Sequence, residues 1–242
     1  MQAAFQVRQK QPAPHFGRKN IMTQDDLKRL AAEKAVEFVP EGEYIGIGTG
    51  STINFFIEAL GKSGKKIKGA VTTSDKSREL MAKYEIPEIH ANEVSRLGIY
   101  IDGADEINHT LQMIKGGGAA LLPEKIVAKL AERFICIADE SKYVSRLGKF
   151  PLPIEVVPMA RSMVARQIVL LGGQPELRIG CKTLHGNEIL DVRGLDLSQP
   201  LSMERELNKI TGLVENGLFA ERAADLLILA RESGIELIQP HV

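Results

Sequence analysis

Carboxylates, lysines and bare glycine backbone are concentrated in one short span, "YIDGADEINHTLQMIKGGGAALLPEKI", residues 100–126. The span holds four acidic residues, two lysines and three consecutive glycines, few of which a hydrophobic core needs. Lys115 directly precedes the glycine run, and glycine lets a substrate approach the backbone closely. A carboxylate base, a cation that steadies a developing oxyanion, and further carboxylates for hydroxyl protons together indicate an acid–base site.

Three carboxylates are candidates for this chemistry. Asp102 and Asp105 follow an apolar run and flank two small residues, so a tight turn can point both the same way. Glu124 falls in the first turn of a predicted helix, where the helix dipole favours its ionised form. A solvated Asp-Gly turn and ordinary helix-end electrostatics are the simpler interpretations. A metal site is less favoured, because the EF-hand spacing is missing and the one histidine nearby is His109.

A second glycine-rich segment, "GIGTGST" at residues 46–52, lies between an apolar run and an amphipathic helical pattern. The N–H groups of such a turn, at the positive end of a helix, form a ready anion site. Its glycines follow neither the dinucleotide-binding nor the P-loop spacing, which favours a phosphate group over a nucleotide. A capped helix after a tight turn is the alternative. The similar segment at residues 72–77, "TTSDKS", is equally well explained by Ser74 as a helix N-cap.

Composition sets limits on the class of protein. The 242 residues are 44% apolar and 26% charged with no net charge, which is typical of a globular chain and not of a nucleic-acid binder. No apolar run is long enough for a membrane span. Cys136 and Cys181 have no partner ligand at metal spacing, and they indicate free thiols in a reducing cytoplasm. Residues 1–21 carry four basic residues, no acidic residue and no apolar period, so we expect a disordered extension or an upstream start before Met22.

Strand-like and helix-like segments alternate over the first part of the chain, which favours a mainly parallel sheet covered on both faces. The predicted helices include residues 23–39, 75–86 and 123–134, and the predicted strands include residues 66–74, 97–102, 111–116 and 133–139. Prolines then punctuate the sequence, and a helix–strand–strand–helix pattern over residues 159–213 predicts a small α+β unit. We therefore predict an α/β domain of residues 22–149 and 220–242, into which residues 150–219 are inserted.

Four segments resemble, in order and spacing, the signature blocks of the A-type ribose-5-phosphate isomerases: "GIGTGST", "YIDGADEIN", "KGGGAALLPEKI" and "FICIADESKYVSRLGKFPLPIEVVPMA". The resemblance runs from Met22 to the C-terminus and leaves residues 1–21 without a counterpart. It implies a Rossmann-like domain with an inserted ferredoxin-like unit. It also implies interconversion of D-ribose 5-phosphate and D-ribulose 5-phosphate, without a metal or organic cofactor, in the non-oxidative pentose phosphate pathway, by a homodimer or homotetramer.

The resemblance further implies residue roles. Glu124 would be the general base that moves a proton between C2 and C1 through an enediolate, and Lys115 would stabilise the negative oxygen. Asp102 and Asp105 would contact sugar hydroxyls and assist ring opening and proton shuttling. The other implied substrate-binding positions are Thr49, Gly50, Ser51, Thr52, Gly103, Ala104, Gly116, Gly117, Gly118, Lys142 and, as a further phosphate contact, Lys28. One tension stays open: a helix N-terminus lowers the pKa of a carboxylate, whereas burial raises it.

Two other functions suit a similar fold. A phosphosugar-binding effector module of a transcription regulator needs a DNA-binding unit, but residues 1–21 are too short for one and no basic recognition helix is found. A sugar-phosphate deaminase or lactonase is expected to use a histidine near the site. Four histidines fall outside the four segments that carry the resemblance, although His109 is close to them in sequence: His90, His109, His185 and His241. We therefore expect the isomerase.

Overall fold

The largest sheet of the computed structural model, which describes residues 22–240, has six strands in the order β13-β12-β6-β3-β1-β2. The predictions for residues 1–21 and His241 lie outside the described residues. Five strands pair in parallel and the edge strand β13 is antiparallel. The Rossmann-like, mainly parallel sheet is thereby confirmed. Its strands are β1 (Tyr44–Ile47), β2 (Gly69–Thr72), β3 (Leu97–Asp102), β6 (Ala131–Asp139), β12 (Leu226–Arg231) and β13 (Gly234–Ile238).

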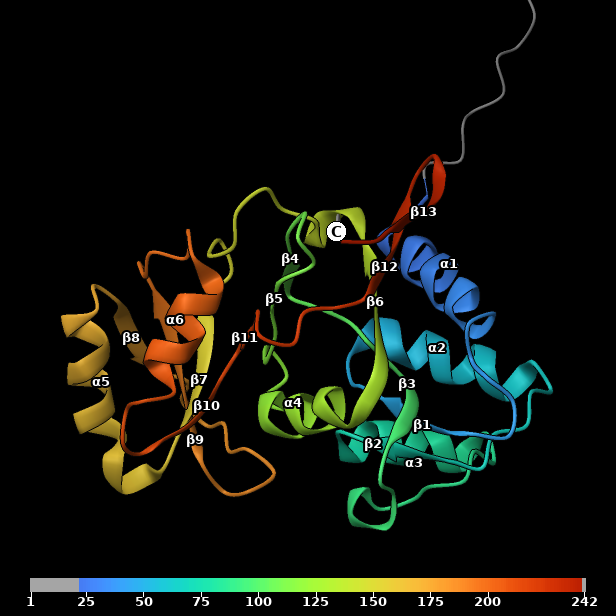
Figure 1. The fold of residues 1–242 in the computed structure, drawn as a ribbon, viewed down its shortest axis with the longest axis horizontal. Helices are drawn as coiled ribbons and strands as arrows, with labels where there is room; N and C mark the ends of the chain where they lie inside the picture. The colour runs from blue at the N-terminus through green and yellow to red at the C-terminus, as the bar shows by residue number, and fades with distance from the viewer. Residues whose placement is uncertain (1–21, 241–242) are drawn as a thin grey trace, which may run out of the picture.

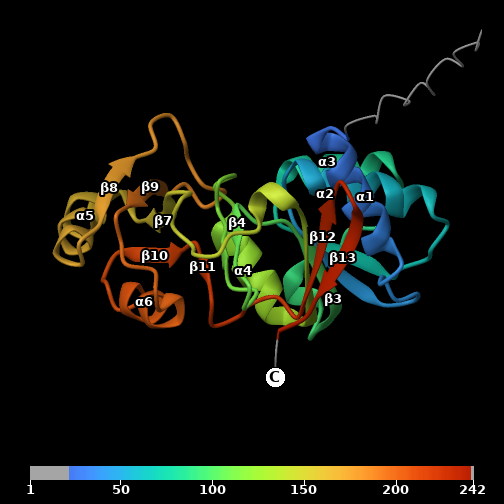
Figure 2. The same cartoon turned by 90° about the horizontal axis from the view of Figure 1, so that it is seen from above.

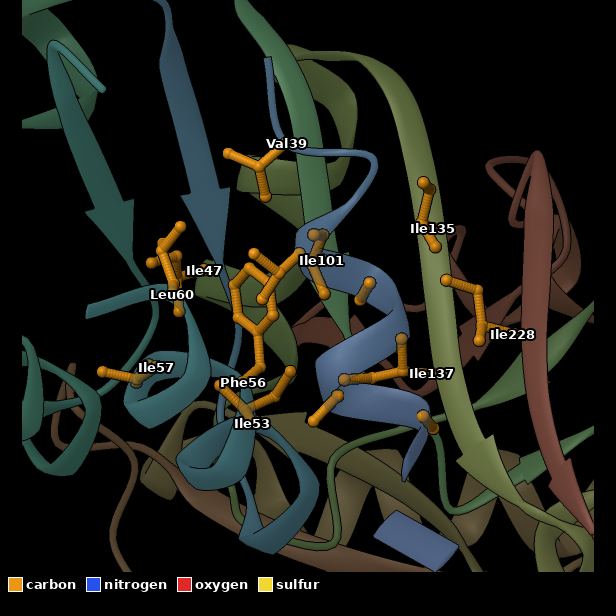
Figure 3. Close-up of a cluster of buried hydrophobic side chains, with 14 of the residues drawn as sticks. Val39, Ile47, Ile53, Phe56, Ile57, Leu60, Ile101, Ile135, Ile137 and Ile228 are labelled. Atoms are coloured by element: carbon orange, nitrogen blue, oxygen red, sulfur yellow. The ribbon is translucent and has the colours of Figure 1, made fainter. Parts of the chain in front are cut away.

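Helices cover both faces of this sheet, which is why its strands are apolar almost throughout. One face packs against α1 (Gln24–Val36), α2 (Ser51–Lys62) and α3 (Asp75–Lys83), as Figure 1 shows. In Figure 3, Phe56 of α2 lies among the isoleucines of the strands, and all of these side chains are buried. The opposite face packs against α4 (Leu121–Leu130), where Val127 joins a cluster with Tyr100 and Phe134.

The helix ends show where local signals suffice. Thr23 caps α1 through a reciprocal capping box with Asp26, as its sequence predicts. The helix predicted at residues 123–134 instead begins at Leu121 and ends at Leu130. The predicted end is wrong because Phe134 lies in β6, where it is paired with Tyr100 of β3. Phe134 fits an amphipathic helix and a buried strand equally well, so its pairing with a neighbouring strand decides which of the two it joins.

The inserted unit has its own four-stranded antiparallel sheet in the order β10-β7-β9-β8. Two helices alternate with these strands in the βαββαβ pattern of a ferredoxin-like unit, and Figures 1 and 2 show the unit at one end of the elongated molecule. The elements in chain order are β7 (Leu152–Val156), α5 (Arg161–Leu170), β8 (Gln174–Leu177), β9 (Glu188–Arg193), α6 (Pro200–Leu207) and β10 (Leu213–Asn216). Within residues 22–240, three short 3-10 helices complete the helical elements: η1 (Ala91–Glu93), η2 (Glu140–Lys142) and η3 (Pro158–Ala160).

Strand β7 was not predicted, because proline removes a backbone donor and is rare inside a sheet. Pro153 nevertheless lies in β7, opposite Asp191 of β9. The pairing of β7 with β10 stops at Ile154, so on that side Pro153 only has to accept a hydrogen bond, and Gly217 N–H donates one at 2.8 Å. The proline is therefore placed where its missing donor costs no ladder bond on that side.

A third, three-stranded sheet joins the two units. It is formed by β4 (Glu106–Ile107), β5 (Met113–Ile114) and β11 (Leu218–Phe219), in the order β11-β5-β4. The strand predicted at residues 111–116 is thus only two residues long, and Lys115 follows it directly. Among the helices of residues 22–240, none has the length and apolar character to cross a membrane.

Candidate active site

The acidic motif and the glycine-rich loop meet at the carboxyl ends of β1 and β3. In the strand order β2-β1-β3-β6-β12, the chain that leaves β1 continues to β2 on one side, and the chain that leaves β3 continues toward β6 on the other side. Connections that leave two neighbouring strands in opposite directions open a crevice at their carboxyl ends, which is where ligands of such sheets bind. Thr49 N–H donates to Asp102 Oδ1 at 3.1 Å across this point. Two motifs about fifty residues apart are thereby joined.

Gly48 allows the two motifs to approach. A Cβ atom at this position would lie 1.9 Å from the Asp102 carboxyl carbon, so a side chain cannot be accommodated there. The Gly48 carbonyl accepts a hydrogen bond from Ser77 Oγ at 2.7 Å, and Thr49 Oγ1 lies 2.7 Å from Ser74 Oγ. Ser74 also caps α3, accepting from Ser77 N–H at 3.2 Å, so the N-cap interpretation of residues 72–77 is confirmed.

The start of α2 offers free donors beside this point. Gly50 precedes the helix with a φ of 109°, in the left-handed region that favours glycine. Within residues 22–240, no side chain caps this helix, and the N–H groups of its first turn remain available. Gly50 and Ser51 are exposed, whereas Thr52 is half-buried. This geometry fits the anion site that the sequence predicts for residues 46–52.

Asp102 is fully buried and its two oxygens are held by four donors. Oδ1 accepts from Thr49 N–H at 3.1 Å and from Gly103 N–H at 2.7 Å. Oδ2 accepts from the Tyr100 hydroxyl and contacts Lys115 Nζ at 2.8 Å. Tyr100 is not among the predicted site residues, although it precedes Asp102 by two residues and so shares its face of the strand. With every oxygen occupied, the Asp102 carboxylate is fixed in position.

Lys115 lies at the centre of the site. Its ammonium contacts Asp102 Oδ2, lies 3.3 Å from Glu124 Oε2 and donates to the Gly103 carbonyl at 2.7 Å. The ring of Phe219, a second residue that sequence analysis missed, lies 5.5 Å from the ammonium. Burial opposes the charge, but the carboxylates of Asp102 and Glu124 outweigh it and hold the pKa of Lys115 above its usual range. The ammonium therefore stays charged.

Glu124 lies in the first turn of α4, with its side chain 4% exposed. Burial raises the pKa of this carboxyl from 4.5 to about 8, because the favourable charge of Lys115 is offset by the negative charges of Asp102 and Asp105. Of the two opposing effects that the sequence leaves open, burial is the one that the structure shows to be large. Among the described residues, Oε2 of Glu124 has no hydrogen-bond partner, and Lys115 contacts it only as an ion pair.

Asp105 orders the glycine run. Its Oδ2 accepts from Gly117 N–H at 2.8 Å, and a Cβ on Gly117 would lie 2.6 Å from Oδ1 of the same carboxylate. Gly116 has a φ of 101° and again needs glycine. Gly118 lies near Thr49, whose Cγ2 would be 3.8 Å from a Cβ on that glycine. The glycine run therefore lines the same crevice as the loop after β1.

Two of the predicted substrate-binding residues lie apart from this cluster. Lys142, in η2 after β6, and Lys28, on α1, have no contact with Asp102, Lys115 or Glu124. The Lys28 ammonium instead pairs with Asp25 at 3.1 Å. In the part of the chain that the structure describes, no group of three or more His, Cys, Asp or Glu side chains is placed to hold a metal ion.

The cluster has the parts that proton transfer next to a carbonyl requires. Glu124 is a buried carboxyl with a raised pKa and a free oxygen, which suits a general base near neutral pH. Lys115 is a fixed cation beside it, suited to stabilise the oxyanion that forms when the proton leaves. Asp102 and Asp105 are carboxylates that can position the ammonium and the glycine run.

Comparisons with known proteins agree with this chemistry. Residues 69–234 match the model of the family described as ribose 5-phosphate isomerase A (phosphoriboisomerase A). The chain is 72% identical over 220 residues to ribose-5-phosphate isomerase A of Neisseria meningitidis serogroup C, covering 91% of this chain and 99% of the relative.

Solved structures agree as well. The crystal structure of ribose 5 phosphate isomerase A from Neisseria gonorrhoeae is 70% identical, with a TM-score of 0.91 over 92% of this chain and all of the other. The enzyme of Methanocaldococcus jannaschii is 37% identical, with a TM-score of 0.85 over 90% of this chain and 100% of its own. These matches favour the isomerase over the effector module and over the deaminase or lactonase. The chain belongs to the ribose 5-phosphate isomerase A family, and it interconverts D-ribose 5-phosphate and D-ribulose 5-phosphate.

Proposed function

We propose that Glu124 is the general base of this isomerisation and that Lys115 stabilises the enediolate oxygen. The observation that carries the proposal is Oε2 of Glu124, a buried carboxyl oxygen without a hydrogen-bond partner among the described residues, 3.3 Å from the Lys115 ammonium. No N–H or O–H group of the described residues donates to this oxygen in hydrogen-bond geometry, so it can take a proton from a substrate. The raised pKa makes the ionised carboxylate a stronger base.

The proposed steps use these residues in sequence. In the open-chain aldose, Glu124 removes the proton from C2, the C–H electron pair forms the C1–C2 double bond, and O1 becomes negative beside Lys115. A proton then moves from O2 to O1, and Glu124 returns its proton to C1, which leaves the carbonyl at C2. Asp105, which is partly exposed, is the proposed contact to the sugar hydroxyls. Fully buried Asp102 holds Lys115 and is the second candidate for proton shuttling between the oxygens.

The substrate phosphate is proposed to bind the loop after β1. Thr49, Gly50, Ser51 and Thr52 supply the free donors at the start of α2, and Gly103, Ala104 and the glycine run line the same crevice. Lys142, on η2, and Lys28, on α1, would add positive charge. These two elements are in contact, because Gln24 of α1 donates a hydrogen bond to Ser141 of η2 at 3.3 Å. One related structure, 37% identical with a TM-score of 0.87, is described as a complex with phospho-erythronic acid. We propose that this phosphorylated acid binds the same crevice here.

The test follows deuterium placed at C2 of ribose 5-phosphate during turnover in ordinary water. A single carboxyl base predicts that part of the label reaches C1 of the ketose and the rest exchanges with solvent. Complete retention at C1 would show a hydride shift and reject the base. In the same assay unphosphorylated ribose should react at least about a hundredfold more slowly, because the phosphate supplies orienting binding energy. Equal rates would reject the phosphate site.

We also propose that the enzyme is a homo-oligomer in the cytoplasm. Three large apolar side chains on the inserted unit are 78–94% exposed and are available for contact with a second copy: Met159, Leu170 and Ile179. Both cysteines are free thiols, which suits a reducing compartment. Light scattering of the purified protein should give a multiple of 26.6 kDa, and cell fractionation should find it with cytoplasmic enzymes. A single-chain mass would reject the oligomer, and recovery outside the cytoplasmic fraction would reject that location.

A further inference from the structure

We propose that Arg178, on the inserted unit, is a positioning residue for the isomerisation, acting through the glycine run that follows Lys115. Arg178 follows β8 and lies 63 positions beyond Lys115, and no motif connects the two in the sequence. The inference rests on the proposed roles of Lys115 and Asp105, because Arg178 itself touches neither residue. It assigns the inserted unit a part in the chemistry of the larger domain.

The contacts of Arg178 divide between two groups. Its Nη1 donates to the carbonyls of Gly116 and Gly117, each at 3.1 Å. Its Nε donates to Asp191 Oδ2 at 2.8 Å and its Nη2 to Oδ1 at 2.5 Å. Asp191 lies on β9, so a strand fixes one side of the guanidinium and the other side holds the loop. The planar fork of arginine can make all four hydrogen bonds at once, whereas a lysine ammonium cannot match this geometry.

One peptide plane shows what this contact does. The Gly116 carbonyl accepts from Arg178, and the N–H of the same peptide group, that of Gly117, donates to Asp105 at 2.8 Å. The carbonyl and the N–H of a trans peptide point in opposite directions. The plane is therefore held between a cation on its carbonyl side and a carboxylate on its N–H side. Its orientation fixes Asp105 and the backbone that leaves Lys115.

The next peptide plane, between Gly117 and Gly118, is held only on its carbonyl side. Arg178 binds the Gly117 carbonyl, so the N–H of Gly118 points away from the inserted unit. No acceptor for this N–H is found within residues 22–240, and Gly118 lies near Thr49. Glycine backbone has little conformational preference of its own. One turn hydrogen bond forms within this segment, from Ala119 N–H to the Gly116 carbonyl at 2.9 Å, and Arg178 adds the contacts that hold both peptide planes from outside.

A purely structural role, docking the inserted unit, has a better candidate elsewhere. Lys125 on α4 is buried and contacts Glu204 at 2.9 Å, Glu215 at 2.9 Å and the Asn216 carbonyl at 2.8 Å. This network and the sheet formed by β11, β5 and β4 join the two units without Arg178. Removal of the guanidinium should therefore leave the units docked and disturb the glycine run.

The test compares Arg178→Ala, Arg178→Lys and the matched control Arg161→Ala. Arg161 forms an ion pair with Glu188 at 3.1 Å in the same unit and has no contact with the glycine run. Arg178→Ala is expected to lower kcat by about 10- to 100-fold, the effect of a misplacement near 1 Å, with little change in KM. Arg178→Lys should lose nearly as much, because one ammonium cannot hold both carbonyls and Asp191. Arg161→Ala should retain wild-type kcat.

Chemical rescue separates positioning from folding. A hollow of about 540 Å³ is lined by Arg178 and Asp191, which gives methylguanidinium a path to the vacated position. Millimolar methylguanidinium should restore kcat of Arg178→Ala several-fold, while Arg161→Ala and wild type do not respond. A kcat of Arg178→Ala equal to wild type overturns the proposal, and so does a loss that methylguanidinium leaves unchanged. Glu124→Gln is assayed alongside: if it keeps full turnover the proposed base fails, whatever the Arg178 variants show.

Discussion

Replacing Glu124 by glutamine is expected to lower kcat by about 10²- to 10⁴-fold, the range for loss of a general base. Glutamine keeps the size of the side chain but is neutral, so it removes both the ability to take a proton and the ion pair with Lys115 at 3.3 Å. The Lys115 ammonium keeps its contacts with Asp102 and the Gly103 carbonyl when the ion pair with Glu124 is lost, so the substitution leaves it anchored. The measurement is the initial rate of ribulose 5-phosphate formation at saturating ribose 5-phosphate.

The pH dependence gives an independent readout of the same residue. The base acts in its ionised form, and burial raises the pKa of Glu124 to about 8. In the wild type, kcat/KM should therefore rise with pH and level off above this pKa. The Glu124→Gln variant should lose this rise of kcat/KM with pH, which is the acidic limb of the profile, altogether. A limb that persists unchanged in Glu124→Gln would assign it to another group.

Stability should vary with pH in the opposite direction to activity. The folded-state pKa of Glu124 is raised above its ordinary value of 4.5, so between pH 4.5 and about 8 the unfolded chain has lost a proton that the folded chain keeps. The free energy of unfolding then falls as pH rises through this window. Glu124→Gln removes this penalty, and its melting temperature relative to wild type should be higher at pH 8 than at pH 5.

Glu155→Gln is the matched control for the Glu124→Gln variant. Glu155 is also a fully buried carboxyl with one unpaired oxygen among the described residues, but it lies in the inserted unit and its other oxygen accepts from Thr183 and Asn187, each at 2.8 Å. We expect its kcat to stay near the wild-type value. If Glu124→Gln behaves like this control, Glu124 is not the base and Asp102 becomes the next candidate.

Lys115→Met is expected to lower kcat by about 10²- to 10³-fold, comparable to the loss of an oxyanion-stabilising donor. Methionine keeps the length and apolar stem of the side chain, which packs near Phe219, and removes the charge. The variant should also melt at a lower temperature, because the buried Asp102 carboxylate loses its 2.8 Å ammonium partner.

A shift of the pH limb distinguishes this effect from general damage. The positive charge of Lys115 lowers the pKa of Glu124, so without it burial and the two aspartates act unopposed. The limb of kcat/KM should consequently move to higher pH in Lys115→Met. Lys125→Met, which also removes a buried lysine that contacts two glutamates, should lower the melting temperature without moving the limb. An unshifted limb in Lys115→Met would mean that the ammonium does not act on Glu124.

Several features of the molecule are determined by local sequence. The capping box of Thr23 forms from residues three positions apart, and it is present as predicted. Gly48 and Gly117 stand where a side chain would collide with Asp102 or Asp105, so the glycine-rich pattern itself predicts close backbone approach. The alternation of apolar strands and amphipathic helices predicts the parallel sheet, because each signal needs only a few neighbouring residues.

Other features depend on partners distant in the sequence. Phe134 could continue a helix or enter a strand, and its pairing beside Tyr100 decides for the strand. Pro153 argues against a strand until the limited pairing of β10 is known. Arg178 carries no signal at all in its own segment, because its function depends on carbonyls 61 and 62 residues away.

By itself, the sequence determined which residue types could do the chemistry, the family that they resemble and the edge of the sheet where they gather. Only the tertiary structure decided the state of each group. Helix position alone favours an ionised Glu124, but burial beside Asp102 and Asp105 raises its pKa to about 8, and burial by distant elements is not a local property. The same holds for Lys115, which burial would neutralise, and which stays charged because folding places two carboxylates around it.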